Sequence, residues 1–154
     1  MAGKDLDRAN DLMNFFKDPE IKTIIATRGG QSSQRLLPLL DYDLIKRNPK
    51  QLIGFSDTTA LQLGLFKISG LITYTGYTLT VNLSPLVKKT LMSCLLNNNY
   101  QIFRGVTVYP GVSKGSLLGG NLTLLTNLMG TPYFPEFNES ILLLEDVGIE
   151  PDRA

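Results

Sequence analysis

The fold is restricted most by a regular alternation of short apolar runs with longer segments of helical periodicity. The short runs are rich in apolar residues, several of them β-branched, and occupy residues 22–27, 51–55 and 71–75. The segments with a helical pattern occupy residues 5–17, 32–40, 58–67 and 85–96, with residues 41–43 as the exit from the second. Strands that alternate with helices form parallel sheets through right-handed crossovers. The pattern therefore predicts an α/β fold, a parallel sheet with helices on both faces.

The pattern changes after a polar break at residues 97–99. Strands are predicted at residues 106–109, 116–118 and 141–144, and a helix at residues 122–129. We therefore divide the chain into two parts. Residues 1–98 form a parallel-sheet domain, and residues 99–154 form part of a smaller, β-rich second domain.

The composition limits which binding partners and which cellular compartment are expected for this chain. The 154 residues carry 15 Lys and Arg against 14 Asp and Glu, so no basic surface for nucleic acid is expected. No apolar run approaches the roughly 20 residues that span a bilayer, and residues 1–10 lack the apolar core of a signal peptide. Cys94 is the only cysteine, which favours a reducing compartment. We expect neither a nucleic-acid nor a membrane partner.

Histidine is absent from the sequence. The chain therefore cannot complete a Ser-His-Asp triad, a histidine metal site or histidine acid–base catalysis from its own residues. Carboxylates are not clustered with further ligands of a suitable type, so no metal is expected. No dinucleotide-binding loop or P-loop is present, and no cofactor is expected.

The first candidate for chemistry is Ser56, which stands between a predicted strand and a predicted helix in the run Gly54-Phe55-Ser56-Asp57-Thr58. A serine on such a turn projects its hydroxyl above the sheet, and the amides that follow it point at a developing oxyanion. The run lacks the second glycine of the nucleophile-elbow motif. A simple helix cap is therefore the alternative role for Ser56.

Two further groups follow predicted strands. The loop Arg28-Gly29-Gly30-Gln31-Ser32-Ser33 can bring backbone amides close to an anion, and its alternative is an ordinary turn. We expect it beside Ser56, because the carboxyl ends of parallel strands share one edge. Glu145-Asp146 follows the last predicted strand, where a carboxylate either orients a base or is solvated. Gly119-Gly120-Asn121 either caps a helix or lines a ligand site.

Together these motifs resemble the LD-carboxypeptidases, peptidase family S66. The resemblance rests on an Arg-Gly-Gly loop, a Leu-Leu-Pro-Leu-Leu-Asp-Tyr-Asp segment, Asn-Pro-Lys and the Gly-Phe-Ser-Asp turn, all within residues 27–65. Further matches follow in order at residues 2–5, 18–22, 115–125, 130–133 and 144–147. The resemblance covers essentially the whole chain.

The resemblance implies a cytoplasmic serine peptidase with a Ser-Glu-His triad that removes the terminal D-alanine from murein tetrapeptides. The resemblance implies that Ser56 is the nucleophile and Glu145 the triad carboxylate. It also implies that the amides of Gly30 and Asp57 form the oxyanion hole. The partner it implies is a murein-derived peptide substrate, and it leaves open whether the complete enzyme is a homodimer. A branch of the family confers immunity to microcin C-type antibiotics, which is the first alternative function.

Three features depart from the family pattern. The family's first strand would precede Ala2, its histidine would follow Ala154, and its His-Gly-Pro segment is Thr75-Gly76-Tyr77 here. Residues 148–154 resemble a family segment shortened by three residues. We therefore expect a truncated family member whose isolated chain is inactive, and a non-catalytic remnant is the second alternative. Arg28 and Arg35 are candidates for the substrate carboxylate, unless they pair with Asp41 or Asp43.

Overall fold

The computed structural model describes residues 2–97 and 102–148. Its larger sheet contains three parallel strands in the order β1 (Thr23–Ile25), β2 (Gln51–Gly54) and β3 (Tyr74–Thr75). The register pairs Ile24 with Leu52 and Ile53 with Tyr74. The predicted parallel α/β sheet is therefore confirmed, with strands at the three predicted runs.

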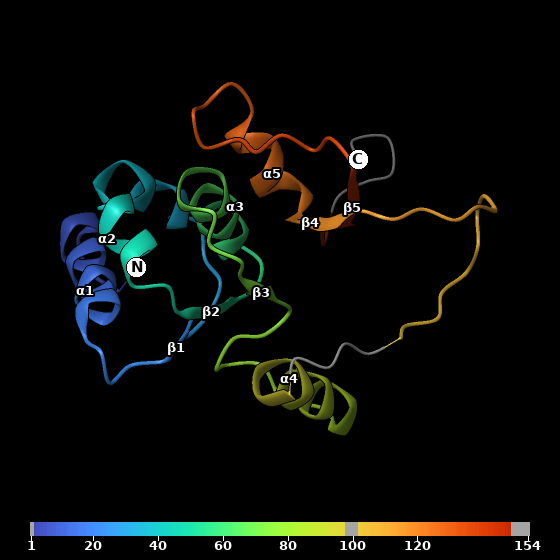
Figure 1. Cartoon of the computed structure of the whole chain (residues 1–154), viewed down its shortest axis with the longest axis horizontal. Helices are drawn as coiled ribbons and strands as arrows, with labels where there is room; N and C mark the ends of the chain where they lie inside the picture. Colours follow the sequence, from blue (N-terminus) through green and yellow to red (C-terminus); the bar gives the residue numbers. More distant parts are fainter. Residues whose placement is uncertain (1, 98–101, 149–154) are drawn as a thin grey trace.

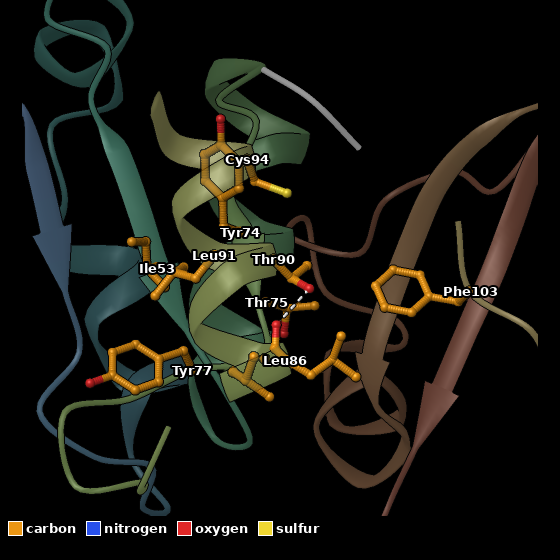
Figure 2. A pocket seen from close by; sticks show the side chains of 11 residues that line it. Ile53, Tyr74, Thr75, Tyr77, Leu86, Thr90, Leu91, Cys94 and Phe103 are labelled. Carbon is orange, nitrogen blue, oxygen red and sulfur yellow. Dashed lines mark hydrogen bonds between the residues drawn. The ribbon is translucent and has the colours of Figure 1, made fainter. Parts of the chain in front are cut away.

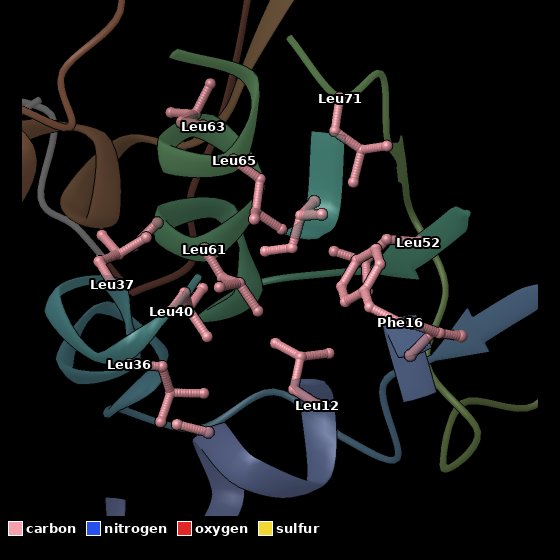
Figure 3. Close-up of a cluster of buried hydrophobic side chains, with 14 of the residues drawn as sticks. Leu12, Phe16, Leu36, Leu37, Leu40, Leu52, Leu61, Leu63, Leu65 and Leu71 are labelled. Atoms are coloured by element: carbon pink, nitrogen blue, oxygen red, sulfur yellow. The ribbon is translucent and has the colours of Figure 1, made fainter. Parts of the chain in front are cut away.

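Helices cover both faces of this sheet (Figure 1). One side holds α1 (Asp5–Lys17), the 3₁₀ helix η1 (Ser33–Leu39), α2 (Tyr42–Arg47) and α3 (Thr58–Ser69), and the other holds α4 (Pro85–Asn97). Successive residues of a strand point to opposite faces. Accordingly, Leu52 lies in the buried cluster with Phe16, whereas Ile53 faces α4 (Figures 2 and 3).

The core lies between α1, η1 and α3. Phe16, Leu37 and Leu65 are at most 1% exposed, and they pack with further leucines from all three helices (Figure 3). Gly64 lies against the side chain of Leu37, where any Cβ would collide with it. This close approach seats α3 directly on η1, so the first turn of α3 is held by a well-packed element.

The predicted helix at residues 32–40 is corrected by the structure. Residues 33–39 form a 3₁₀ helix that contains Pro38, whose ring removes a backbone donor and disfavours a continuous α-helix. Asp41 then begins α2 as its cap, and its carboxylate accepts a hydrogen bond from the Leu44 N–H at 2.9 Å. Residues 41–43 are therefore the start of another helix and not an exit.

A second, smaller sheet pairs β4 (Ser116–Asn121) with β5 (Ser140–Glu145) in parallel. The intervening helix α5 (Leu122–Leu128) packs on α3, and Leu125 and Leu128 are buried in the main core. This helix attaches the second sheet to the first unit.

The strand predicted at residues 106–109 is wrong. Val106 and Val108 are 94% and 96% exposed, and no strand of the described chain pairs with this segment, which runs away from the sheets (Figure 1). A β-branched run becomes a strand only where a neighbouring chain offers hydrogen bonds. The predicted domain boundary and most of the polar break at residues 97–99 lie outside the described residues. The division into two domains therefore stays a prediction.

Among the described residues, no helix has the length and apolar character needed to cross a membrane.

Candidate active site

Ser56 lies on a sharp turn between β2 and α3, as predicted. Its φ of 62° is in the left-handed region, which a non-glycine residue adopts at a free-energy cost. Gly54 makes the turn tight, because a Cβ at that position would collide with Thr58. The helix begins at Thr58, and Asp57 before it already has helical φ and ψ of −50° and −35°. Within the described chain the Ser56 hydroxyl accepts no hydrogen bond from the first turn of α3, so the structure gives no support to the alternative role of Ser56 as a simple cap. The half-buried Ser56 side chain is therefore held in a specific, strained conformation.

The glycine loop lies against this turn. A Cβ on Gly29 would lie 3.0 Å from the Ser56 Cβ and 3.1 Å from its Oγ, so only glycine fits without displacing the serine. A Cβ on Gly30 would lie 3.6 Å from Asp57 Oδ2. The structure thus brings Gly29, Gly30, Ser56 and Asp57 together at the carboxyl edge of the larger sheet, as the sequence predicts.

Two hydrogen bonds join the loop to the turn. The Ser33 N–H donates to Asp57 Oδ2 at 3.0 Å, and the Ser33 hydroxyl donates to the Asp57 carbonyl at 2.5 Å. Asp57 is 5% exposed, so both bonds are shielded from water. The sequence does not reveal the contact between the Asp57 carboxylate and Ser33. From the sequence, Asp57 is expected to contribute only its backbone amide and a negative charge in the first helical turn.

Arg8 supports the far side of the loop, and Arg35 shares its Asp5 partner. Arg8 donates to the Ser32 carbonyl at 3.2 Å, and both guanidinium groups lie 2.6 Å from the Asp5 carboxylate. The hydrogen bond from Arg8, together with the charges of both arginines, lowers the pKa of Asp5. Arg35 thus pairs with Asp5 and not with Asp41 or Asp43. Within the described chain Arg28 forms neither an ion pair nor a hydrogen bond, and it is exposed.

The turn presents backbone N–H groups without acceptors. Neither the Asp57 N–H nor the Gly30 N–H donates a hydrogen bond within residues 2–97 and 102–148. The Asp57 N–H also lies at the N-terminus of α3, where the helix dipole favours negative charge. These two amides are suited to an anion or to the oxyanion of an acyl-transfer intermediate.

Glu145 reaches the same end of α3 from the second sheet. It pairs in register with Asn121, whose N–H donates to Thr59 Oγ1 at 3.1 Å. The Thr59 N–H in turn donates to the Ser56 carbonyl at 2.9 Å. One carboxylate oxygen of Glu145, Oε2, is buried and has no hydrogen-bond donor in the described chain. Glu145 is therefore not a simple solvated strand end.

Asp146 fixes the end of β5. Its carboxylate accepts hydrogen bonds from the N–H of Thr123 (2.8 Å), the hydroxyl of Thr123 (2.7 Å), the side chain of Asn121 (3.0 Å) and the N–H of Val147 (2.8 Å). The Thr123 hydroxyl is the largest cause of a lowered pKa of Asp146, to about 2. Asn121 caps α5 through the Leu124 N–H at 3.1 Å, which confirms its predicted role as a helix cap.

A cavity of about 230 Å³ lies elsewhere, between α4 and the sheet (Figure 2). Its lining is largely apolar and includes Ile53, Tyr74 and Leu91, but neither Ser56 nor Gly30. The described part of the chain also holds no cluster of three metal-ligating side chains. The polar groups that the structure places at the Ser56 end of α3 are the serine hydroxyl, the two backbone amides and the Glu145 carboxylate.

Comparison with known proteins gives matches over both parts of the chain. Residues 1–76 match the family model for the LD-carboxypeptidase N-terminal domain, and residues 114–154 match the model for the LD-carboxypeptidase C-terminal domain. The murein tetrapeptide carboxypeptidase of Pseudomonas aeruginosa is 35% identical over 167 residues, covering 96% of this chain and 53% of that protein. The microcin C7 self-immunity protein MccF of Escherichia coli is 34% identical over 181 residues, covering 94% and 53%.

Among solved structures, the muramoyltetrapeptide carboxypeptidase from Oxalobacter formigenes superposes with a TM-score of 0.91 at 30% identity. That match covers 99% of this chain and 54% of the other. The chain spans about half the length of the curated relatives it matches.

Proposed function

The chain belongs to the LD-carboxypeptidase family, peptidase family S66, and from this premise we propose that it forms the nucleophile-bearing part of a serine carboxypeptidase. The proposed reaction is hydrolysis of the bond between an L-centre and the terminal D-alanine of a murein tetrapeptide. The observation that carries the proposal is Ser56. It is held at φ 62° against Gly29, beside an Asp57 amide that has no acceptor in the described chain.

In the proposed mechanism, Ser56 Oγ attacks the scissile carbonyl carbon and forms a tetrahedral intermediate. The amides of Gly30 and Asp57 stabilise its oxyanion. As the intermediate collapses, the proton taken from Ser56 passes to the amine nitrogen of the departing D-alanine, and water then hydrolyses the acyl-serine that remains. In the proposed triad the base that takes the serine proton is a histidine imidazole. The 154 residues contain no histidine, so we place this base outside them. Glu145 orients that imidazole, a role that its buried Oε2 without a donor supports.

The substrate of a carboxypeptidase ends in a carboxylate, which needs a cationic or amide-rich partner. We assign this role to Arg28. It directly precedes Gly29 and is exposed, and within the described chain it has no ion pair, whereas Arg35 is held by Asp5. Arg28→Ala is expected to abolish the preference of the chain for a tetrapeptide acid over its C-terminal amide, measured by calorimetry. Arg35→Ala serves as the control and retains the preference.

Binding also tests the substrate class without requiring turnover. The chain is expected to bind murein tetrapeptide more tightly than the diastereomer that ends in L-alanine. Equal binding of the two peptides would contradict the proposal.

Immunity to a microcin C-type peptide-nucleotide is the second candidate function. It is favoured by structural similarity to the microcin C7 self-immunity protein, one structure of which is a complex with adenosine monophosphate. Competition by adenosine monophosphate against the murein tetrapeptide distinguishes the candidates. The murein assignment predicts no competition, and the immunity assignment predicts displacement of the peptide.

A further inference from the structure

The loop of residues 28–33 carries one of the two proposed oxyanion amides, yet little holds it in place. Within the described chain, residues 28–31 form no hydrogen bonds. The loop is anchored before this stretch by the Thr27 carbonyl, which accepts from the Thr80 N–H at 3.1 Å. After it, the anchors are the Arg8 contact to Ser32 and the two bonds between Ser33 and Asp57.

Two hydrogen bonds join Ser33 to Asp57, and we call this pair of bonds the clamp. The carboxylate of Asp57 accepts the backbone N–H of Ser33, and the Asp57 carbonyl accepts the Ser33 hydroxyl. Burial of Asp57 limits competition by water for both bonds. The same Asp57 supplies the other oxyanion amide from its backbone. One residue therefore ties the position of one amide to that of the other.

We propose that the Asp57 side chain is a positioning residue that sets the distance between the Gly30 and Asp57 amides, and so shapes the oxyanion hole. This inference rests on the proposed function. Asp57 Oδ1 is buried without a hydrogen-bond donor in the described chain, an arrangement that costs free energy. Within the described chain, the carboxylate therefore holds the loop through Oδ2 alone.

The experiment uses the 154-residue chain and two probes. One is a phosphonate dipeptide analogue ending in D-alanine, whose tetrahedral anion mimics the intermediate, and the other is the corresponding planar peptide. Oxyanion-hole amides discriminate between these probes, whereas a purely structural contact affects both equally. The ratio of the two dissociation constants, measured by calorimetry, is therefore the readout.

Asp57→Ala is expected to lower the preference for the phosphonate by about tenfold or more, because losing one oxyanion donor outright costs about 10²–10³ in rate. Asp57→Asn keeps an acceptor for the Ser33 N–H and is expected to restore most of the preference. Asp41→Ala is the matched control, since it also removes a carboxylate that accepts a backbone N–H, at a helix cap away from Ser56. Its expected preference is that of the wild type.

The outcomes separate this inference from the function on which it rests. A wild-type chain without any preference for the phosphonate overturns both. A wild-type preference that Asp57→Ala leaves intact overturns the positioning role alone. A second measurement is needed in case Asp57→Ala does not fold. In folded Asp57→Asn, the Ser33 amide hydrogen is expected to exchange with solvent no more than a few-fold faster than in the wild type. Exchange at the rate of an unbonded amide would contradict the clamp.

Discussion

Ser56 holds a backbone conformation that costs free energy and that glycine adopts without penalty. The strain is retained because the turn presents a hydroxyl beside Gly29, and this is the form that the strand–serine–helix pattern predicts. The motif located the serine, and the family resemblance assigned its role. The bonds from Ser33 to Asp57 were not predictable, because they depend on how two loops approach each other in space.

The strain at Ser56 gives a stability prediction. Ser56→Gly is expected to be about 0.5–1 kcal/mol more stable than Ser56→Ala, since both lack the hydroxyl and only glycine relieves the positive φ. Urea denaturation of the two variants measures the difference. Glu139, at φ 52°, is the other non-glycine residue with a positive φ in the described chain. The difference in unfolding free energy between Glu139→Gly and Glu139→Ala measures the same effect away from the site. A Ser56→Ala chain as stable as Ser56→Gly would show that the turn is unstrained.

For the helices and strands, the periodicity of apolar residues predicts most elements correctly, and each wrong prediction has a physical cause. Pro38 makes residues 33–39 a 3₁₀ helix, and the exposed run at residues 106–109 lacks a strand to pair with. The bonds that fasten β5 to α5 through Asp146 also escaped prediction. They join residues 23 and 25 positions apart, and no sequence pattern indicates which residues Asp146 contacts.

The attachment of β5 to α5 is expected to weaken in acid. The pKa of Asp146 in the folded chain is about 2, below its ordinary value of 3.8, so the unfolded chain binds more protons between these values. The stabilisation is therefore complete above about pH 4 and is lost as the pH falls towards 2. Urea midpoints recorded from pH 5 to pH 2 are expected to fall less steeply for Asp146→Asn than for the wild type. Parallel curves would contradict the assignment.

At the scale of the whole molecule, the smaller sheet is open to solvent. Ile141, Leu142, Leu143 and Leu144 of β5 are 40–51% exposed, although parallel sheets are normally covered on both faces. The isolated chain is therefore expected to self-associate as its concentration rises. Sedimentation should show less association for Leu142→Lys, whereas Glu139→Lys, which changes charge nearby without removing apolar surface, should behave like the wild type. Equal association of both variants would place the contact elsewhere.

We propose that Ser56 and Glu145 are the nucleophile and the triad carboxylate of a serine carboxypeptidase, and that these 154 residues lack its base. The measurement is the rate of D-alanine release from murein tetrapeptide by two proteins, the 154-residue chain and a fusion of it to the C-terminal half of the Pseudomonas aeruginosa relative. We predict background release from the chain, because no histidine can activate Ser56. The fusion should release D-alanine, and Ser56→Ala should abolish that release. Turnover by the isolated chain, or turnover by the fusion that survives Ser56→Ala, would contradict the account.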